Sequence, residues 1–182
     1  MKNYEEKAKL RGSVDIALMG PDGTVKERRY IPNLVVQSGK TWIATRMLGA
    51  TQGALAADER STGTTTSCMA YMAIGTSVTT ATVNDTSLTA EVTFGGDIVG
   101  YNRAKLTTSS YSTGIVTYVA TFAVNNPQRT NTSNTTAITE AGIFNSSNMQ
   151  VSGGTMLCRT TFNAVNKGND DTLQITWTIT VS

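Results

Sequence analysis

The sequence of 182 residues contains no histidine and only two cysteines, Cys68 and Cys158. The lack of histidine removes the commonest general base and the commonest metal ligand, and with them the Ser-His-Asp and Cys-His catalytic arrangements. Two isolated cysteines do not make the disulfide framework of a small secreted protein. We expect both to be small buried thiols, and a Cys68–Cys158 bridge is the alternative that the sequence leaves open.

Charge and long apolar runs are also scarce. The net charge is only +2, which is too weak for a nucleic-acid-binding domain with its clustered lysines and arginines. The N-terminal stretch "MKNYEEKAKLRG" is polar, so we expect no signal peptide, and no apolar run approaches the length of a membrane span. The sequence therefore predicts a soluble protein, made in a cytoplasm, that binds neither nucleic acid nor a membrane.

The acidic residues do not form a recognisable catalytic or metal-binding pattern. Asp170 and Asp171 precede the last predicted strand, where we expect a solvated turn with local hydrogen bonds. A calcium loop would need more oxygen ligands at a fixed spacing. Residues 39–41 end like a phosphate-binding loop, but Leu34 stands where that motif has its first glycine. We expect no enzyme activity, no cofactor and no metal.

Three charged residues lie inside predicted strands. Glu140 stands in an otherwise apolar strand, and Arg103 and Arg159 stand in two others. A glutamate and an arginine on one sheet face form a structural salt bridge. We expect such a pair between Glu140 and one of the two arginines rather than a catalytic group, because the chain offers no nucleophile with a base beside it.

The chain is rich in patterns of two-residue period, and the clearest is at its C-terminal end, in "DTLQITWTITVS". Apolar and polar side chains alternate there without a break, as in a half-buried β-strand. The apolar set is Leu173, Ile175, Trp177, Ile179 and Val181, and the polar set is Thr172, Gln174, Thr176, Thr178 and Thr180. We expect the apolar set in the core, with Trp177 as an anchor, whereas the threonine row either faces water or contacts another subunit.

Further patterns predict a β-rich protein with one early helix. Alternation on both sides of "GPDG" (residues 20–23) predicts a hairpin, in which Asp22 bonds to nearby backbone and Gly23 takes positive φ. Residues 35–50 have helical spacing, with Ser38 as the expected N-cap and Gly49 as the stop. The remaining expected strands are residues 69–74, 98–106, 115–124, 137–144, 155–162 and 172–181, and Gly142 is a candidate bulge.

These elements predict a mainly β fold, an antiparallel β-sandwich that is jelly-roll-like, with one short N-terminal helix. Residues 1–11 are charged and lack a core stripe, so we expect a flexible N-terminal arm. Residues 12–182 then form a single β-sandwich domain with an insertion at about residues 50–67. That insertion is either a mobile surface loop or a segment that orders against a neighbouring subunit.

Three stretches together resemble virion structural proteins of tailed bacteriophages. They are "PNLVVQSGKTWIATRM" (residues 32–47), "MAYMAIGTSVTTATVNDTSLTAEV" (residues 69–92) and "ITEAGIFNSS" with "GGTMLCRTTFNAVNKGNDDTLQITWTITVS" (residues 138–182). The resemblance covers most of the chain after the arm, and the stretches are specific as a set. It departs mainly at residues 50–67 and 125–136. The resemblance implies a binding role and carries over no catalytic residue.

Within this family we favour a capsid decoration (cement) protein that binds across major capsid protein subunits and stabilises the head, because the chain is small, forms one domain without staples and begins with a charged arm. A tail, baseplate or fibre component is the alternative station, and a carbohydrate-binding module for host attachment is the alternative of another class. The expected partners are the major capsid protein or other virion proteins and further copies of the chain, with a trimer favoured. The expected partner-binding residues are Lys2, Tyr4, Lys7, Lys9, Arg11, Thr176, Thr178 and Thr180.

Overall fold

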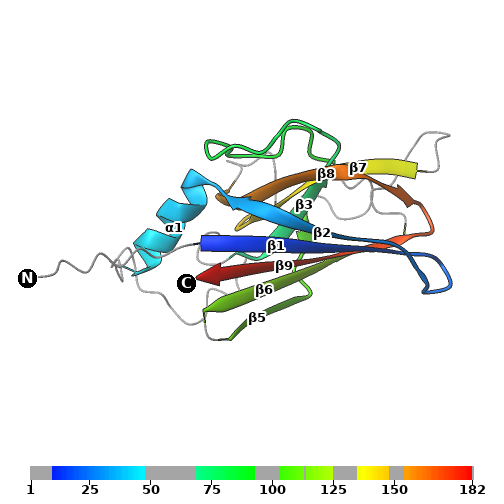
Figure 1. The fold of residues 1–182 in the computed structure, drawn as a ribbon, viewed down its shortest axis with the longest axis horizontal. Coiled ribbons are helices and arrows are strands. Elements are labelled where there is room, and N and C mark those ends of the chain that lie inside the picture. The colour runs from blue at the N-terminus through cyan, green and yellow to red at the C-terminus, as the bar shows by residue number, and fades with distance from the viewer. Residues whose placement is uncertain are drawn as a thin grey trace, which may run out of the picture.

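The computed structural model describes residues 10–47, 69–92, 103–112, 114–124, 135–147 and 154–181. In these residues the chain forms nine strands and one helix (Figure 1). The elements in chain order are β1 (Leu10–Met19), β2 (Val25–Val35), α1 (Gln37–Met47), β3 (Tyr71–Gly75), β4 (Ala104–Lys105), β5 (Thr108–Ser112), β6 (Ile115–Phe122), β7 (Thr135–Phe144), β8 (Met156–Gly168) and β9 (Thr172–Val181).

All nine strands belong to one antiparallel sheet in the order β4-β3-β7-β8-β2-β1-β9-β6-β5. Strand β2 joins the two halves of this sheet. Most of β2 pairs with β1, and only Leu34 and Val35 at its end pair with β8. The sheet therefore bends sharply at β2, and the half containing β3, β7 and β8 turns away from the half containing β1, β9 and β6 (Figure 1).

The two edge strands of the sheet come together at one corner. Only Leu106 and Thr107 separate β4 from β5, although these strands lie at opposite ends of the strand order. The Leu106 amide donates to the Ala70 carbonyl on the β3 side at 2.9 Å, and the Thr107 amide donates to the Val119 carbonyl of β6 at 2.8 Å. The sheet is therefore curled into a half-barrel whose edges are joined by a short piece of chain.

The predicted mainly β, antiparallel protein with one early helix is confirmed. The predicted sandwich differs from the structure in one respect, because its two layers are halves of a single continuous sheet. The physical reason is β2, whose eleven residues are long enough to pair with β1 and then with β8. Alternation within a strand reports which face is buried but not which strands are neighbours.

The inner faces of the two halves enclose the main core. Trp177, Phe122 and Ile16 are its largest fully buried apolar side chains from β9, β6 and β1, and Ile138, Ile143 and Leu157 come from β7 and β8. The alternation in β9 is confirmed for Leu173, Ile175, Trp177 and Ile179, which are buried, whereas Val181 at the end of the strand is 47% exposed and was wrongly placed in the core. The prediction of Trp177 as a core anchor is confirmed.

The predicted hairpin at residues 20–23 is also confirmed, with the expected turn chemistry. The Gly20 amide donates to the Thr24 carbonyl at 2.8 Å, and Gly23 has a φ of +79°, which a residue without a Cβ adopts without strain. The Asp22 carboxylate accepts hydrogen bonds from the Thr24 amide at 3.1 Å and the Thr24 hydroxyl at 2.7 Å. This turn sets the register of β1 on β2.

The helix begins two residues earlier than predicted, since an N-cap at Ser38 would make Gly39 the first helical residue. Because α1 starts at Gln37, Ser38 lies in its first turn and is not the N-cap. The Ser38 hydroxyl instead donates to the Met156 carbonyl at 2.8 Å, which ties the helix to β8. The expected stop at Gly49 and the insertion at residues 50–67 lie outside the described residues, as does the side chain of Trp42.

Several strand boundaries differ from the sequence prediction. Strand β5, in "TSSYS", was not predicted, because it is polar on both faces. Strand β8 continues through Gly168, and β1 begins at Leu10, so Leu10 and Arg11 are strand residues rather than part of the arm. Leu10 and Arg11 pair with Val181 and Thr180 of β9 and so belong to the sheet.

The predicted bulge at Gly142 is wrong. Gly142 pairs regularly with Arg159. The two irregularities of this ladder lie on β8: Leu157 is an extra residue opposite the step from Ile143 to Phe144, and residues 162–164 stand opposite the single residue Thr139. Arg29 of β2 donates to the carbonyls of Asn163 and Ala164 in this bulge, at 3.1 and 3.0 Å. The guanidinium thus satisfies backbone groups that the ladder cannot pair, and it also bridges β2 and β8 where these strands have separated.

Candidate functional site

A segment without regular structure crosses the outer face of β3 and β7. We call residues 76–92 the strap; it forms the green loop at the top of Figure 1. Two glycines let it lie against the sheet. A Cβ at Gly75 would stand 2.5 Å from the Ala90 carbonyl oxygen, and one at Gly142 would stand 3.0 Å from Leu88 Cδ2. A Cβ at position 142 would also stand 3.0 Å from the Cys158 carbonyl oxygen, so glycine there makes room for both the strap and β8.

The strap covers a second, small apolar cluster. Leu88 of the strap packs with Val36, Ala73, Phe144 and Met156, all of which are buried. These side chains project from the face of the sheet opposite to the main core. Strand β7 is therefore buried on both of its faces from Ile138 to Phe144, which explains why its sequence alternates so weakly.

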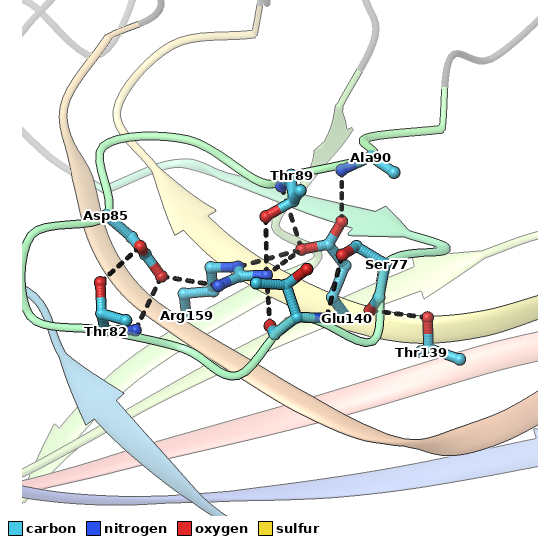
Figure 2. A network of polar contacts seen from close by, with 9 residues as sticks. Ser77, Thr82, Asp85, Thr89, Ala90, Thr139, Glu140 and Arg159 are labelled. Carbon is cyan, nitrogen blue, oxygen red and sulfur yellow. Dashed lines mark hydrogen bonds and ion pairs between the residues drawn. The ribbon is translucent and has the colours of Figure 1, made fainter.

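An ion cluster fixes the strap on this face (Figure 2). Its centre is Glu140 of β7, whose carboxylate accepts hydrogen bonds from the strap amides of Thr89 at 3.2 Å and Ala90 at 2.7 Å. The same carboxylate accepts from Arg159 Nε at 3.0 Å and from Arg159 Nη2 at 2.8 Å. The side chains of Glu140 and Arg159 are 0% and 1% exposed, so both charges are removed from water and each depends on the other.

Arg159 of β8 also reaches the strap directly. Its guanidinium donates to the Asp85 carboxylate at 2.6 Å, the Thr79 carbonyl at 2.9 Å and the Thr89 hydroxyl at 3.0 Å. Asp85 in turn accepts from the amide and hydroxyl of Thr82, at 2.9 and 2.7 Å. We call Asp85, Glu140 and Arg159 the ion cluster; it satisfies strap groups that have no strand partner.

The ionisation of the ion cluster follows from these bonds. Burial by itself favours neutral Asp85, but the hydrogen bonds from Thr82 and Arg159 outweigh it and hold the pKa of Asp85 below its usual 3.8. Burial likewise disfavours the charged guanidinium, yet the bonds to Glu140 and Asp85 raise the pKa of Arg159. Arg159 and Asp85 are therefore charged at neutral pH.

A second buried ion pair holds the end of the strap. Arg103 donates to Glu91 through Nε at 2.8 Å and Nη2 at 3.1 Å, and both side chains are at most 2% exposed. The Val92 amide donates to the Ile74 carbonyl at 2.9 Å, so this end also pairs with β3. The prediction of a Glu140–arginine pair is confirmed with Arg159, whereas Arg103 pairs with Glu91, which sequence reasoning did not single out.

The three sequence stretches at residues 32–47, 69–92 and 138–182 meet at this place. Residues 69–92 supply the strap and β3, residues 138–182 supply Glu140 and Arg159, and residues 32–47 supply Val36 and α1. These stretches therefore hold the strap on the sheet. Every carboxylate of the ion cluster is engaged by arginine or backbone, and in the described part of the chain no group of three metal-binding side chains occurs.

A hollow of about 510 Å³ lies beside Asp85. Its lining is mostly polar and comes from the start of α1, from the strap, which also supplies the apolar Val83, and from Thr155. The Thr82 hydroxyl donates to the Asp85 carboxylate, which also accepts from Arg159, and these bonds stabilise the strap.

The other half of the sheet has a different outer face. In β9, Thr176, Thr178 and Thr180 are half-buried and point away from the core. Thr178 lies directly between Ser13 of β1 and Thr117 of β6. We call the outward side of β2, β1, β9, β6 and β5 the open face, and in Figure 1 these strands run side by side. No described helix or strand packs on it.

The open face is nearly uncharged. Asp15, opposite Thr176, is paired with Arg28 of β2 through bonds of 2.7 and 3.1 Å, and Arg28 lies over the ring of Tyr30 at 5.2 Å. Arg11 is exposed at one end of the face, opposite Thr180. The structure thus brings together Arg11, Thr176, Thr178 and Thr180 of the predicted contact residues. Lys2, Tyr4, Lys7 and Lys9 lie outside the described residues.

The turn at Asp170 and Asp171 differs from its prediction. Asp170 is exposed as expected, but Asp171 is 4% exposed and is not solvated. Its carboxylate accepts from the Gly168 amide at 2.9 Å and from Lys26 at 2.7 Å, and the pKa of Asp171 is lowered because these bonds outweigh burial. The local hydrogen bond was predicted; the contact with Lys26 could not be, since 145 residues separate the pair.

The expectation of a buried thiol is confirmed for Cys158. Cys158 is a free, fully buried thiol, and burial raises its pKa, which makes it unreactive. Cys68 lies outside the described residues.

Comparison with protein-family models, with curated proteins and with solved structures finds no match for the chain. Among the described residues, no helix has the length and apolar character needed to cross a membrane.

Proposed function

We propose that this protein is a structural component of a tailed-phage virion, most specifically a decoration protein that binds across major capsid protein subunits. Two things support the proposal: the resemblance of the three sequence stretches and the open face. The observation that carries most weight is the open face, where Thr176, Thr178 and Thr180 form the middle of a broad, nearly uncharged surface. The jelly-roll-like sandwich predicted from the sequence remains part of this proposal.

The chemistry of the open face suits contact between protein subunits. Threonine and serine side chains are short, so they lose little rotamer freedom on association. Each offers a hydroxyl that donates and accepts, and threonine adds a methyl group. A surface that met only water would have no reason to lack lysine and glutamate, the usual solvated residues. On this proposal Thr176, Thr178 and Thr180 lie between subunits.

The N-terminal residues are the proposed attachment to the capsid. Lys2, Tyr4, Lys7 and Lys9 precede β1, whereas Leu10 and Arg11 are paired in it. A deletion should therefore remove residues 1–9 only, so that the pairing of β1 with β9 is kept. We expect a folded domain that no longer decorates capsids; undiminished decoration would reject the role of these residues.

The deciding experiment is the copy number of the chain in purified particles, measured by quantitative mass spectrometry against the major capsid protein. A ratio of one or more copies per three capsid subunits indicates a lattice-covering decoration protein. A few to a few dozen copies per particle places the chain in the tail, baseplate or a sparse fibre. Its absence from particles rejects the virion proposal.

One observation favours a second candidate, a carbohydrate-binding module for host attachment. A cleft of about 430 Å³ opens where β2 and β8 separate, lined by Arg29, Tyr30, Ile31, Phe162 and Asn163. Tyr30 is 72% exposed, and an aromatic ring of this kind offers an apolar surface with a polar end. A glycan array on the purified chain, with Tyr30→Ala as the control variant, distinguishes this candidate: binding that Tyr30→Ala abolishes would support it.

A further inference from the structure

We infer that the open face is the interface of a two-fold dimer, in which a second copy of this chain packs its own open face against the first. This inference rests on the proposed function, in which the open face lies between subunits, and it names the occupant. It also replaces the trimer favoured by the sequence with a two-fold arrangement, which pairs one surface patch with itself.

The central rows of the face are the first part of the argument. The register places Ser13, Thr178 and Thr117 in one row across β1, β9 and β6, and Ser110 of β5 continues it. The next row joins Asp15, Thr176 and Val119. All are short side chains, and the longer Arg28 and Tyr30 stand on β2 at the margin of the face, so the central rows hold no residue that would keep a second sheet away.

Charge is the second part of the argument. Within these rows the charged residue of β1 is Asp15. Its Oδ2 lies 2.7 Å from Nη2 of Arg28, which neutralises it, and the exposed Tyr30 stands opposite Asp15 on β2. A strongly basic or acidic partner would therefore find little to bind. A hydroxyl is both a donor and an acceptor, so a row of Thr and Ser is complementary to a second row of the same kind. A surface with these properties fits a copy of itself best.

The size of the face is the third part. Strands lie about 4.8 Å apart and rise about 3.3 Å per residue, so five strands of about eight residues present roughly 600 Å² of flat area. A standard stable interface buries about 800 Å² on each partner. Since side chains make the accessible area larger than the flat area, the open face is large enough for one stable contact.

The middle of the face supplies a sharp test. Strand β9 is the central one of the five, so in a two-fold dimer Thr178 lies near the axis and faces Thr178 of the second copy. Sedimentation equilibrium of the full chain over a range of concentrations should show a monomer–dimer equilibrium. Thr178→Lys should weaken it at least about 100-fold, because two like charges would meet in a contact that excludes water.

Two controls keep the result interpretable. Thr80→Lys places the same charge on an exposed position of the strap and should leave the dimer unchanged. Thr178→Glu should also give a monomer, and an equal mixture of Thr178→Lys and Thr178→Glu should form a mixed dimer, because opposite charges then meet at the axis. Unchanged thermal unfolding of each variant shows that the fold is intact.

The outcomes separate this inference from the proposed function. A wild-type chain that stays monomeric at all concentrations, or a dimer that Thr178→Lys leaves intact, overturns the inference. A trimer overturns the two-fold arrangement. If the chain is a monomer in solution but occurs in particles at one or more copies per three capsid subunits, the dimer inference is wrong and the virion proposal stands. If the chain is a dimer in solution but is absent from particles, the virion proposal is wrong and the dimer inference stands.

Discussion

The two halves of the sheet solve the same problem in different ways. Each has one face in the main core and one face pointing outward. On the half that contains β3, β7 and β8, the chain covers the outer face itself with the strap and buries Glu140 and Arg159 beneath it. On the half that contains β1, β9 and β6, no described part of the chain does so, and the outer face consists of short hydroxyl side chains.

This difference indicates which face of the sheet is available to bind another protein. A buried ion pair is costly to desolvate and does not by itself prove stability, but once formed it fixes one arrangement, because removing either partner leaves an unpaired charge. The covered face is therefore committed to the fold. The open face contributes no such contacts and is free to bind, so substitutions on the two faces should have opposite consequences for folding and for association.

The largest expected effect comes from breaking the ion cluster. Arg159→Met removes every guanidinium bond to Glu140, Asp85 and the strap, and it leaves Glu140 buried without its cation. We expect the free energy of unfolding in urea to fall by about 3–5 kcal/mol. The matched control is Arg28→Met, which removes an exposed, solvent-screened pair and should lower the free energy of unfolding far less. Equal losses in the two variants would contradict the assignment.

The next effect concerns the apolar contact of the strap. Leu88→Ala should destabilise the protein by about 2 kcal/mol, the low end for a buried leucine, since the strap can partly collapse into the space. Val78→Ala, at a strap position that is 78% exposed, should cost less than about 0.5 kcal/mol. Limited proteolysis should also cleave the strap of Leu88→Ala faster than that of Val78→Ala. A resistant strap in both variants would show that Leu88 does not anchor it.

Features of the fold and the site could be predicted from the sequence where the interacting residues are close together along the chain. The β1–β2 turn and the alternation of β9 depend on neighbours within a few residues, and both were predicted correctly. The salt bridge at Glu140 was predicted because a charged residue inside an apolar strand requires a partner. Which arginine it takes was left open, because nineteen residues separate it from Arg159 and the answer depends on strand register.

The strap could not be predicted at all. Residues 76–92 have no periodicity from which a position against the sheet could be inferred, and Gly142 was interpreted as a bulge. The physical signal was present but indirect. The buried face of β7 carries Glu140 and Gly142, a charge and a residue without a side chain, and together they indicate that another piece of backbone lies there. A weakly alternating strand buried on both faces is the feature to look for.

Acid should loosen the covered face before the open one. The pKa of Asp85 is lowered in the folded protein, so its contribution to stability is fully present above its unfolded value of about 3.8 and is lost as the pH falls through the folded value. We expect the free energy of unfolding to decline below about pH 4 in the wild type and less steeply in Asp85→Asn. Identical pH profiles for the two proteins would show that the strap does not depend on the charge of Asp85.

The smallest effects compare one threonine from each face. Thr139 is buried and its hydroxyl donates to the Ser77 carbonyl of the strap at 2.9 Å, so Thr139→Ala leaves that carbonyl unpaired and should cost about 1–2 kcal/mol. Thr176→Ala, on the open face, should change the free energy of unfolding by less than about 0.5 kcal/mol. Both are best measured in the Thr178→Lys background, so that dimer formation does not contribute. The two substitutions remove the same atoms from adjacent halves of one sheet. Equal losses in the free energy of unfolding would therefore mean that the strap adds no stability, and the distinction between the covered face and the open face would have to be given up.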